Sequence, residues 1–252
     1  MITSDRKQSQ TSHRFKAFEE LKNSPDVPLL PLPNLQVFLE DSAARRNITH
    51  DPTFNTILTQ IKLVLYHLIA SEGAFTDIRY IIEKIIQNVE AAKAALGRRL
   101  GSNREFVRQD LCNFLQRDTP AIIFKSTVLQ SWNWGFVNKG EEVGAAENEL
   151  FLSMDLMQAL QNPATQDLLN ISQDLLDQQK LRLSVLWKIT FMHELMHATT
   201  KYFLSPEVIT PNIPGLEGDG EGHGEAGWSL ENWYLGYKLE AIWMKEDVEK
   251  PH

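Results

Sequence analysis

Residues 193–197 read His-Glu-Leu-Met-His, a spacing that can build a metal centre. Side chains at positions i and i+4 of an α-helix project from one face, so His193 and His197 can bind one metal ion through their imidazoles. Neutral nitrogen ligands preserve the charge of an ion such as Zn²⁺, and that charge lowers the pKa of a bound water. Glu194 would lie beside this water, where its carboxylate can accept a proton as a general base. The pattern therefore predicts water activation at a zinc centre.

The surroundings of the motif favour this interpretation. Glu194 is the only charged residue from Ile189 to Thr200, in a segment whose apolar residues predict a long helix. A charged side chain buried on such a helix is costly unless it is paired or lies beside a metal ion. The alternative, two hydrogen-bonded histidines and a solvated Glu194, fits an apolar helix less well.

This segment resembles the zincin metallopeptidases, whose signature is HExxH on an active-site helix. Residues 190–198 (TFMHELMHA) also have the uncharged neighbours usual in that family. The metzincin branch would need glycine and histidine where this chain has Thr200 and Phe203, so that branch is excluded. The chain resembles uncharacterised metallopeptidase-like proteins of the gluzincin type more closely than the secreted digestive enzymes.

The gluzincin resemblance implies a third metal ligand from a glutamate on a later helix. Glu225 opens the first convincing helix after a glycine-rich loop (EAGWSLENW), and its Glu-Ala pair resembles the third-ligand helices of that branch. Glu217 has the separation seen in thermolysin-like enzymes, but it lies among glycines and a proline, which disfavour a helix. An acidic residue in the first turn of a helix is also favourable without any metal. We expect the metal ligands to be His193, His197 and Glu225, with Glu217, Glu221 and His223 as alternatives to Glu225.

Two further features of a zincin cleft have candidates in the chain. An oxyanion donor is needed near the metal, and we expect His223, just before Glu225, to be this catalytic residue, with Tyr202, Tyr234 and Tyr237 as alternatives. Zincins commonly line the cleft with an edge strand that pairs with an extended peptide. The strand predicted at 149–155 is the candidate, and the alternative is an internal strand with Leu150 and Leu152 in the core.

Hydrophobic periodicity predicts the elements that must position these residues. Helices are expected at 35–39, 54–68, 75–96 with Gly97 as its stop, 106–115, 166–178, 181–203 and 225–235. Strands are expected at 121–124, 132–137, 149–155 and 237–244. The predicted fold class is α+β, rich in helix, with a small mixed sheet packed on the HExxH helix.

The domain organisation follows from length and composition. The chain has 252 residues, enough to bury a sizeable core. We expect a flexible polar N-terminal tail at 1–24, a helical subdomain at 25–118 and a zincin-like catalytic subdomain at 119–252, the last two forming one compact unit.

Charge and hydropathy restrict the partners and the compartment. The chain has 25 Lys+Arg against 33 Asp+Glu, a net charge of −8, which argues against nucleic-acid binding. No apolar run reaches the roughly 18 residues of a membrane span, and the first 25 residues lack the apolar core of a secretory leader. Cys112 is the only cysteine, which favours a reducing compartment. We expect a cytoplasmic protein that acts on a peptide or small-molecule substrate, with no nucleic-acid or membrane partner.

The expected function is that of a zinc metallopeptidase-like hydrolase, in which Glu194 activates a zinc-bound water for attack on a peptide carbonyl. Two alternatives stay open: a zinc-dependent enzyme acting on a small metabolite, and an inactive zincin-like interaction protein. A closed apolar pocket would favour the metabolite, and a groove beside an edge strand would favour the peptide.

Overall fold

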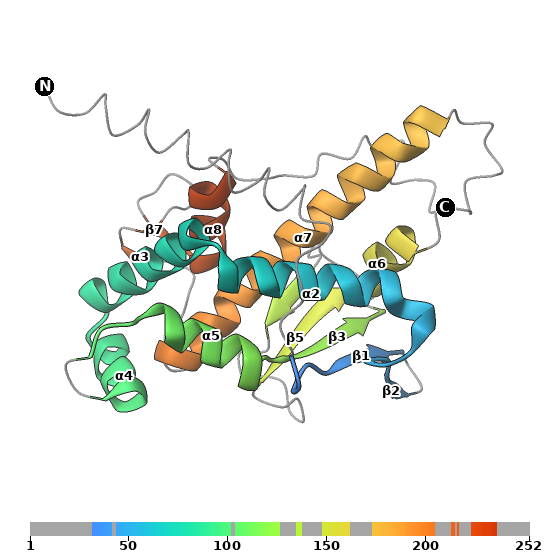
Figure 1. Ribbon diagram of the computed structural model, residues 1–252. Coiled ribbons are helices and arrows are strands. Elements are labelled where there is room, and N and C mark those ends of the chain that lie inside the picture. The colour runs from blue at the N-terminus through green and yellow to red at the C-terminus, as the bar shows by residue number, and fades with distance from the viewer. Residues whose placement is uncertain are drawn as a thin grey trace, which may run out of the picture.

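The computed structural model describes residues 32–41, 44–101, 104–126, 135–137, 148–161, 173–204, 213–214, 216 and 223–235. Within these ranges a mixed five-stranded sheet packs against several helices (Figure 1). The predicted α+β class, helix-rich with a small mixed sheet, is confirmed. No helix in these ranges combines the length and the apolar character that a membrane crossing needs.

The sheet has the strand order β2-β1-β3-β5-β4. Its strands are β1 (Val37–Glu40), β2 (Arg45–Asn47), β3 (Ala121–Lys125), β4 (Gly135–Val137) and β5 (Glu149–Ser153). Strands β1, β3 and β5 are parallel, and the two outer strands β2 and β4 run antiparallel to their neighbours. Strand β4 is therefore an antiparallel edge strand.

Two predictions about these segments are wrong. The segment at 35–39 does not form a helix; its apolar residues enter β1, where Val37 pairs with Ile122 and is completely buried. The strand predicted at 149–155 is not an edge strand, because β5 lies between β3 and β4. The alternative for this segment is confirmed, since Leu150 and Leu152 belong to the hydrophobic core.

The helices follow the apolar periodicity more closely. They are α2 (Asn55–Ala70), α3 (Glu72–Asn88), α4 (Glu90–Leu100), α5 (Arg108–Arg117), α6 (Met154–Gln161), α7 (Gln173–Leu204) and α8 (Ala226–Leu235), with a 3-10 turn, η1 (Pro52–Phe54), before α2. Two short strands, β6 (Ile213–Pro214) and β7 (His223–Gly224), pair before α8. The helices predicted at 54–68, 106–115 and 225–235 are confirmed within a few residues.

The helix predicted at 75–96 is wrong in its boundaries, because two helices replace it. The backbone of Val89 is extended, with φ −129° and ψ 103°, and separates α3 from α4. Gly97 lies inside α4, which ends instead at Leu100, followed by Gly101 with φ 95° as the C-cap. The periodicity hides the break because the side chain of Val89 still packs against the core.

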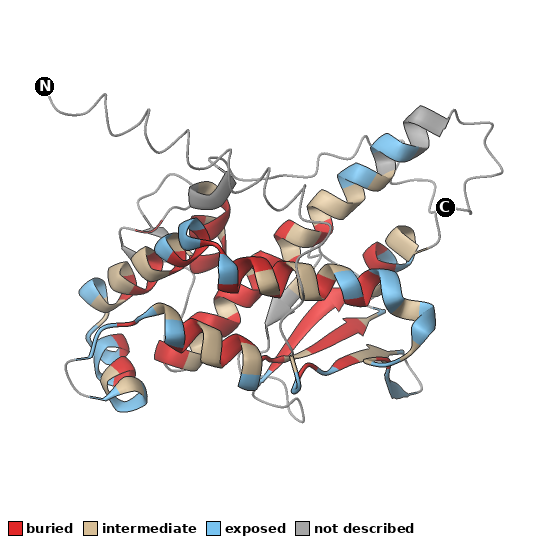
Figure 2. Ribbon diagram, in the orientation of Figure 1, coloured by how far each residue is buried: buried red, intermediate tan, exposed pale blue. Residues whose placement is uncertain are grey.

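Helix α7 is the longest helix described, with 32 residues. It replaces the two helices predicted at 166–178 and 181–203 by one continuous helix. Residues 162–172, and the strand predicted at 237–244, lie outside the described ranges. The described residues at 177–186 of α7 are exposed or half-buried, whereas the part that carries the HExxH motif is enclosed by its neighbours (Figure 2). Trp187 and Phe191 of this part share one core with residues of α2, α3, α5 and the sheet.

Candidate metal centre

Helix α7 presents His193 and His197 side by side, one turn apart. Both histidines are half-buried, while the residues between them, Glu194 to Met196, are buried. The two Nε2 atoms are 3.2 Å apart. The helix therefore points two imidazole nitrogens at one spot on an otherwise buried face.

Glu225 faces both imidazoles from the start of α8. Its Oε1 lies 3.0 Å from Nε2 of His193, and its Oε2 lies 3.0 Å from Nε2 of His197. The same Oε1 accepts a hydrogen bond of 3.2 Å from the backbone N–H of Trp228, so Glu225 also caps α8. Glu225 thus stabilises the start of α8 without any metal and also occupies the position of the predicted third ligand.

The three predicted ligands fit a metal ion. His193, His197 and Glu225 each offer a ligand atom, and these atoms lie within 4.8 Å of one another. Ligands about 2.0–2.1 Å from a tetrahedral zinc ion are separated from each other by roughly 3.3 Å. The observed separations of 3.2 Å and 3.0 Å are close to that value. Two imidazoles and one carboxylate also form the donor set of catalytic zinc sites.

Glu231 holds His193 from the other side of the ring. Its Oε1 lies 2.6 Å from Nδ1 of His193, and the residue is only 9% exposed. A carboxylate on one imidazole nitrogen fixes the ring and directs the other nitrogen to a metal. Glu231 is one of the acidic residues downstream of the HExxH motif that the sequence offers as a third metal ligand, and it lies instead on the other ring nitrogen of His193.

The charges of this cluster depend on one another. Burial lowers the pKa of His193, but its hydrogen bonds to Glu225 and Glu231 outweigh burial and raise that pKa to about 10. Burial raises the pKa of Glu225, and its hydrogen bonds to His193 and His197 bring it well below its usual range. In the metal-free protein His193 is therefore an imidazolium between two carboxylates. An ion that binds Nε2 replaces this proton.

Strand β4 lies directly against Glu194. A Cβ atom at Gly135 would be 2.7 Å from Cγ of Glu194 and 3.1 Å from Cγ2 of Thr190, much closer than such atoms normally approach. Glycine is therefore the residue that lets the edge strand reach α7 at this point. Glu194 is 7% exposed, so its carboxylate is held between the edge strand and the helix.

A second glycine brings α8 to α7. A Cβ atom at Gly227 would lie 2.5 Å from both Cδ2 and Nε2 of His193. The missing side chain lets the start of α8 approach the imidazole closely enough for Glu225 and Glu231 to reach it. Neither glycine contact can be predicted from the sequence, because a glycine in a short strand or at a helix start does not indicate which residue lies opposite it.

The remaining candidates are not brought to the centre by the described part of the structure. The hydroxyl of Tyr202 donates a hydrogen bond of 2.8 Å to Asp118, and the ring lies beneath the guanidinium of Arg99. The backbone of His223 pairs with Pro214, but its side chain lies outside the description, so its oxyanion role stays a prediction. The described ranges also exclude the side chain of Tyr234 and the whole of Glu217, Glu221 and Tyr237.

Comparison of the chain with protein-family models, curated proteins and solved structures gave no significant match. The resemblance to zincins is carried by the HExxH spacing and by the Glu-Ala pair at the start of α8. The geometry of the side chains therefore carries the functional argument.

Proposed function

We propose that this protein is a zinc-dependent hydrolase and that its substrate is a peptide. The observation that carries the proposal is the convergence of His193, His197 and Glu225 beside the buried carboxylate of Glu194. A donor set of two histidines and one glutamate leaves a coordination position for a water or a substrate oxygen. A structural zinc site needs four protein ligands, whereas the metal-binding cluster found among the described residues has three.

Each residue of the centre has a distinct task in this proposal. His193, His197 and Glu225 hold the ion, and Glu231 orients His193 through Nδ1. When bound, zinc polarises a carbonyl and makes water acidic enough to give up a proton near neutral pH. Glu194 accepts that proton and passes it to the leaving amine, a role that requires it to be ionised in the resting protein.

Strand β4 is the feature that favours a peptide over a small metabolite. It ends the sheet, and no described strand pairs with its outer side. Gly135 of this strand lies so close to Glu194 that a Cβ atom would clash with its side chain, so the edge strand passes next to the proposed base. An extended peptide can pair with such an edge through its backbone, which places a peptide bond beside Glu194.

The first test is the metal content of the purified chain. We expect about one zinc per chain in the wild type. His197→Ala and Glu225→Ala should lose the metal, whereas Glu217→Ala, a matched loss of one carboxylate from the preceding glycine-rich sequence, should retain it. Depletion in Glu217→Ala but not in Glu225→Ala would move the third ligand, and a metal-free wild type would reject the zinc centre.

The second test is hydrolysis. Zinc-loaded protein is incubated with a random peptide library, and the products are identified by mass spectrometry. Glu194→Gln is the control, since it removes the base but keeps a side chain of similar size. We expect cleavage by the wild type to fall by roughly 10²–10⁴-fold in Glu194→Gln while zinc content is unchanged. Equal cleavage by both proteins would reject Glu194 as the base.

A further inference from the structure

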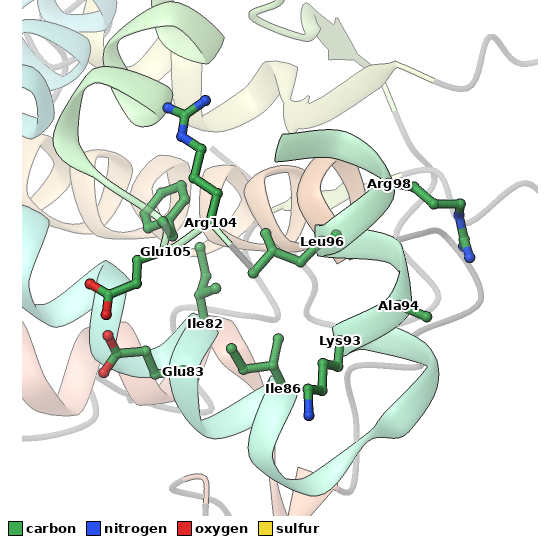
Figure 3. Close-up of a pocket in the computed structure, with 11 residues that line it drawn as sticks. Ile82, Glu83, Ile86, Lys93, Ala94, Leu96, Arg98, Arg104 and Glu105 are labelled. Atoms are coloured by element: carbon green, nitrogen blue, oxygen red, sulfur yellow. The ribbon is translucent and has the colours of Figure 1, made fainter. Parts of the chain in front are cut away.

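A groove separate from the metal centre lies between α3, α4 and residues 104–106 (Figure 3). Its volume is about 570 Å³, within the range of small-molecule sites. None of its lining residues belongs to the metal centre. Its apolar surface is formed by Ile82, Ile86, Leu96 and Phe106, of which Ile82 is completely buried. The groove therefore offers a fixed apolar wall that is part of the core.

Gly97 lines this groove from inside α4. Apart from proline, glycine is the least favourable residue in a helix interior. A Cβ atom at position 97 would meet nothing within 4 Å, so close packing does not require glycine here. A left-handed backbone does not require it either, because Gly101 is the glycine with positive φ in the described ranges. The missing side chain instead keeps space open in the wall and exposes the helix backbone to a ligand.

The charges around the groove are unequally neutralised. Glu83 and Glu105 both pair with Arg79, at 2.6 Å and 3.3 Å. Arg104 pairs with Asp110 at 2.6 Å. Lys93, one turn before Gly97, is exposed and forms no ion pair with a described residue. Figure 3 shows Lys93 extending beside Ile86, whereas the side chain of Arg98, which also lines the groove, extends away from Ile86.

We propose that this groove binds an aliphatic monocarboxylate, with its chain against Ile82, Ile86 and Leu96 beside Gly97 and its carboxylate at Lys93. The apolar wall provides hydrophobic burial for the chain, roughly a fourfold gain in affinity for each fully buried methylene. Glu83 and Glu105 share Arg79 at the other end of the wall, whereas Lys93 extends beside Ile86 and forms no ion pair with a described residue, so the ligand carboxylate is assigned to Lys93. Because the protein has a net charge of −8, a local cation is needed for an anion to bind. The site is independent of the proposed hydrolase.

Calorimetric titration of the full chain tests the ligand class. The probes are dodecanoate and dodecyltrimethylammonium, both below their micellar concentrations, and acetate. We expect saturable binding of one dodecanoate per chain. The ammonium probe, which has the same tail and the opposite charge, should bind at least tenfold more weakly, as should acetate, which lacks the tail. No saturable binding of dodecanoate, or equal binding of the two long-chain probes, would overturn the proposal.

Variants of the groove test its position. Gly97→Leu fills the open space with a good helix former, so we expect dodecanoate affinity to fall at least tenfold while Tm is unchanged or higher. Lys93→Gln should weaken dodecanoate binding at least fivefold, and Arg99→Gln, on the same helix but not among the residues that line the groove, should leave it unchanged. If Gly97→Leu does not fold, Gly97→Ala replaces it, with a Tm about 2–4 °C above wild type and weaker binding. Unchanged affinity in the folded Gly97 variant would overturn the proposal.

Discussion

Gly227→Ala tests whether α8 lies as close to His193 as the structure shows, because the steric clash that it creates opposes the stabilisation expected from the helix preference of alanine. The new Cβ would lie 2.5 Å from Cδ2 and Nε2 and 2.6 Å from Cε1 of His193. Carbon atoms pack at about 3.5–4.0 Å, so α7 and α8 must separate by roughly 1 Å. The ring has little freedom to turn away, since Glu231 holds Nδ1 at 2.6 Å and Glu225 faces Nε2 at 3.0 Å. A shift of this size lengthens both contacts beyond hydrogen-bond distance.

The two effects of this substitution have opposite signs. Alanine is preferred to glycine in a helix by up to about 1 kcal/mol, so propensity alone predicts stabilisation. Overpacking of a well-packed contact costs about 1–3 kcal/mol. We therefore expect Gly227→Ala to be destabilised by up to about 2 kcal/mol and to bind zinc at least tenfold more weakly.

The measurements are urea unfolding of the metal-free protein and zinc competition with a chromogenic chelator. Gly97→Ala is the matched control, because its Cβ would meet nothing within 4 Å and only the propensity gain remains. We expect the two alanine variants to move stability in opposite directions, with zinc affinity changed only in Gly227→Ala. If Gly227→Ala gains stability as Gly97→Ala does and keeps wild-type zinc affinity, the close approach of α8 to His193 is not as described.

Three other perturbations address separate parts of the structure. Glu231→Gln removes the carboxylate from Nδ1 of His193 and should leave the fold intact. Zinc affinity, measured by chelator competition, should fall about 10–100-fold. An unchanged affinity would contradict the orienting role of Glu231. Gly135→Ala would place a Cβ atom 2.7 Å from Cγ of Glu194 and so displace the proposed base. The value of kcat/KM on the cleaved peptides should then fall at least tenfold while zinc content is retained. Full activity would exclude contact between β4 and Glu194. Burial lowers the pKa of His67 from 6.5 to about 4, so the folded state binds fewer protons than the unfolded state between these values. The stabilisation from neutral His67, about 3 kcal/mol, is complete above pH 6.5 and is lost as the pH falls toward 4, so urea unfolding of His67→Gln should show a shallower pH dependence than wild type across this window.

The parts of the fold and site that could be predicted are those set by local sequence. His193 and His197 are four residues apart on one helix, so their proximity follows from helix geometry alone. Glu225 could be identified because an acidic residue at a helix start follows a glycine-rich loop, although only the fold brings it to 3.0 Å from both imidazoles. The periodicity of 54–68 likewise predicts α2, since most of its apolar positions face one core.

The features that could not be predicted depend on contacts between distant segments. Residues 37–40 are too few to distinguish a helix from a strand, and pairing with β3, as in Val37 with Ile122, decides the outcome. The position of β5 inside the sheet depends on β4 and β3 together, which its own apolar residues do not reveal. The contacts of Gly135 and Gly227 are invisible in the sequence for the same reason, since each concerns the residue opposite the glycine.

The position of Glu225 between His193 and His197 gives the centre the character of a reversible crosslink. It joins the end of α7 to the start of α8 across the 205–224 segment, in a chain whose single cysteine allows no internal disulfide. A metal ion that binds only the folded state would raise the free energy of unfolding by about 1.4 kcal/mol for each tenfold increase in free metal above the dissociation constant. The attachment of α8 would then respond to the supply of metal ions and not to the redox state of its surroundings.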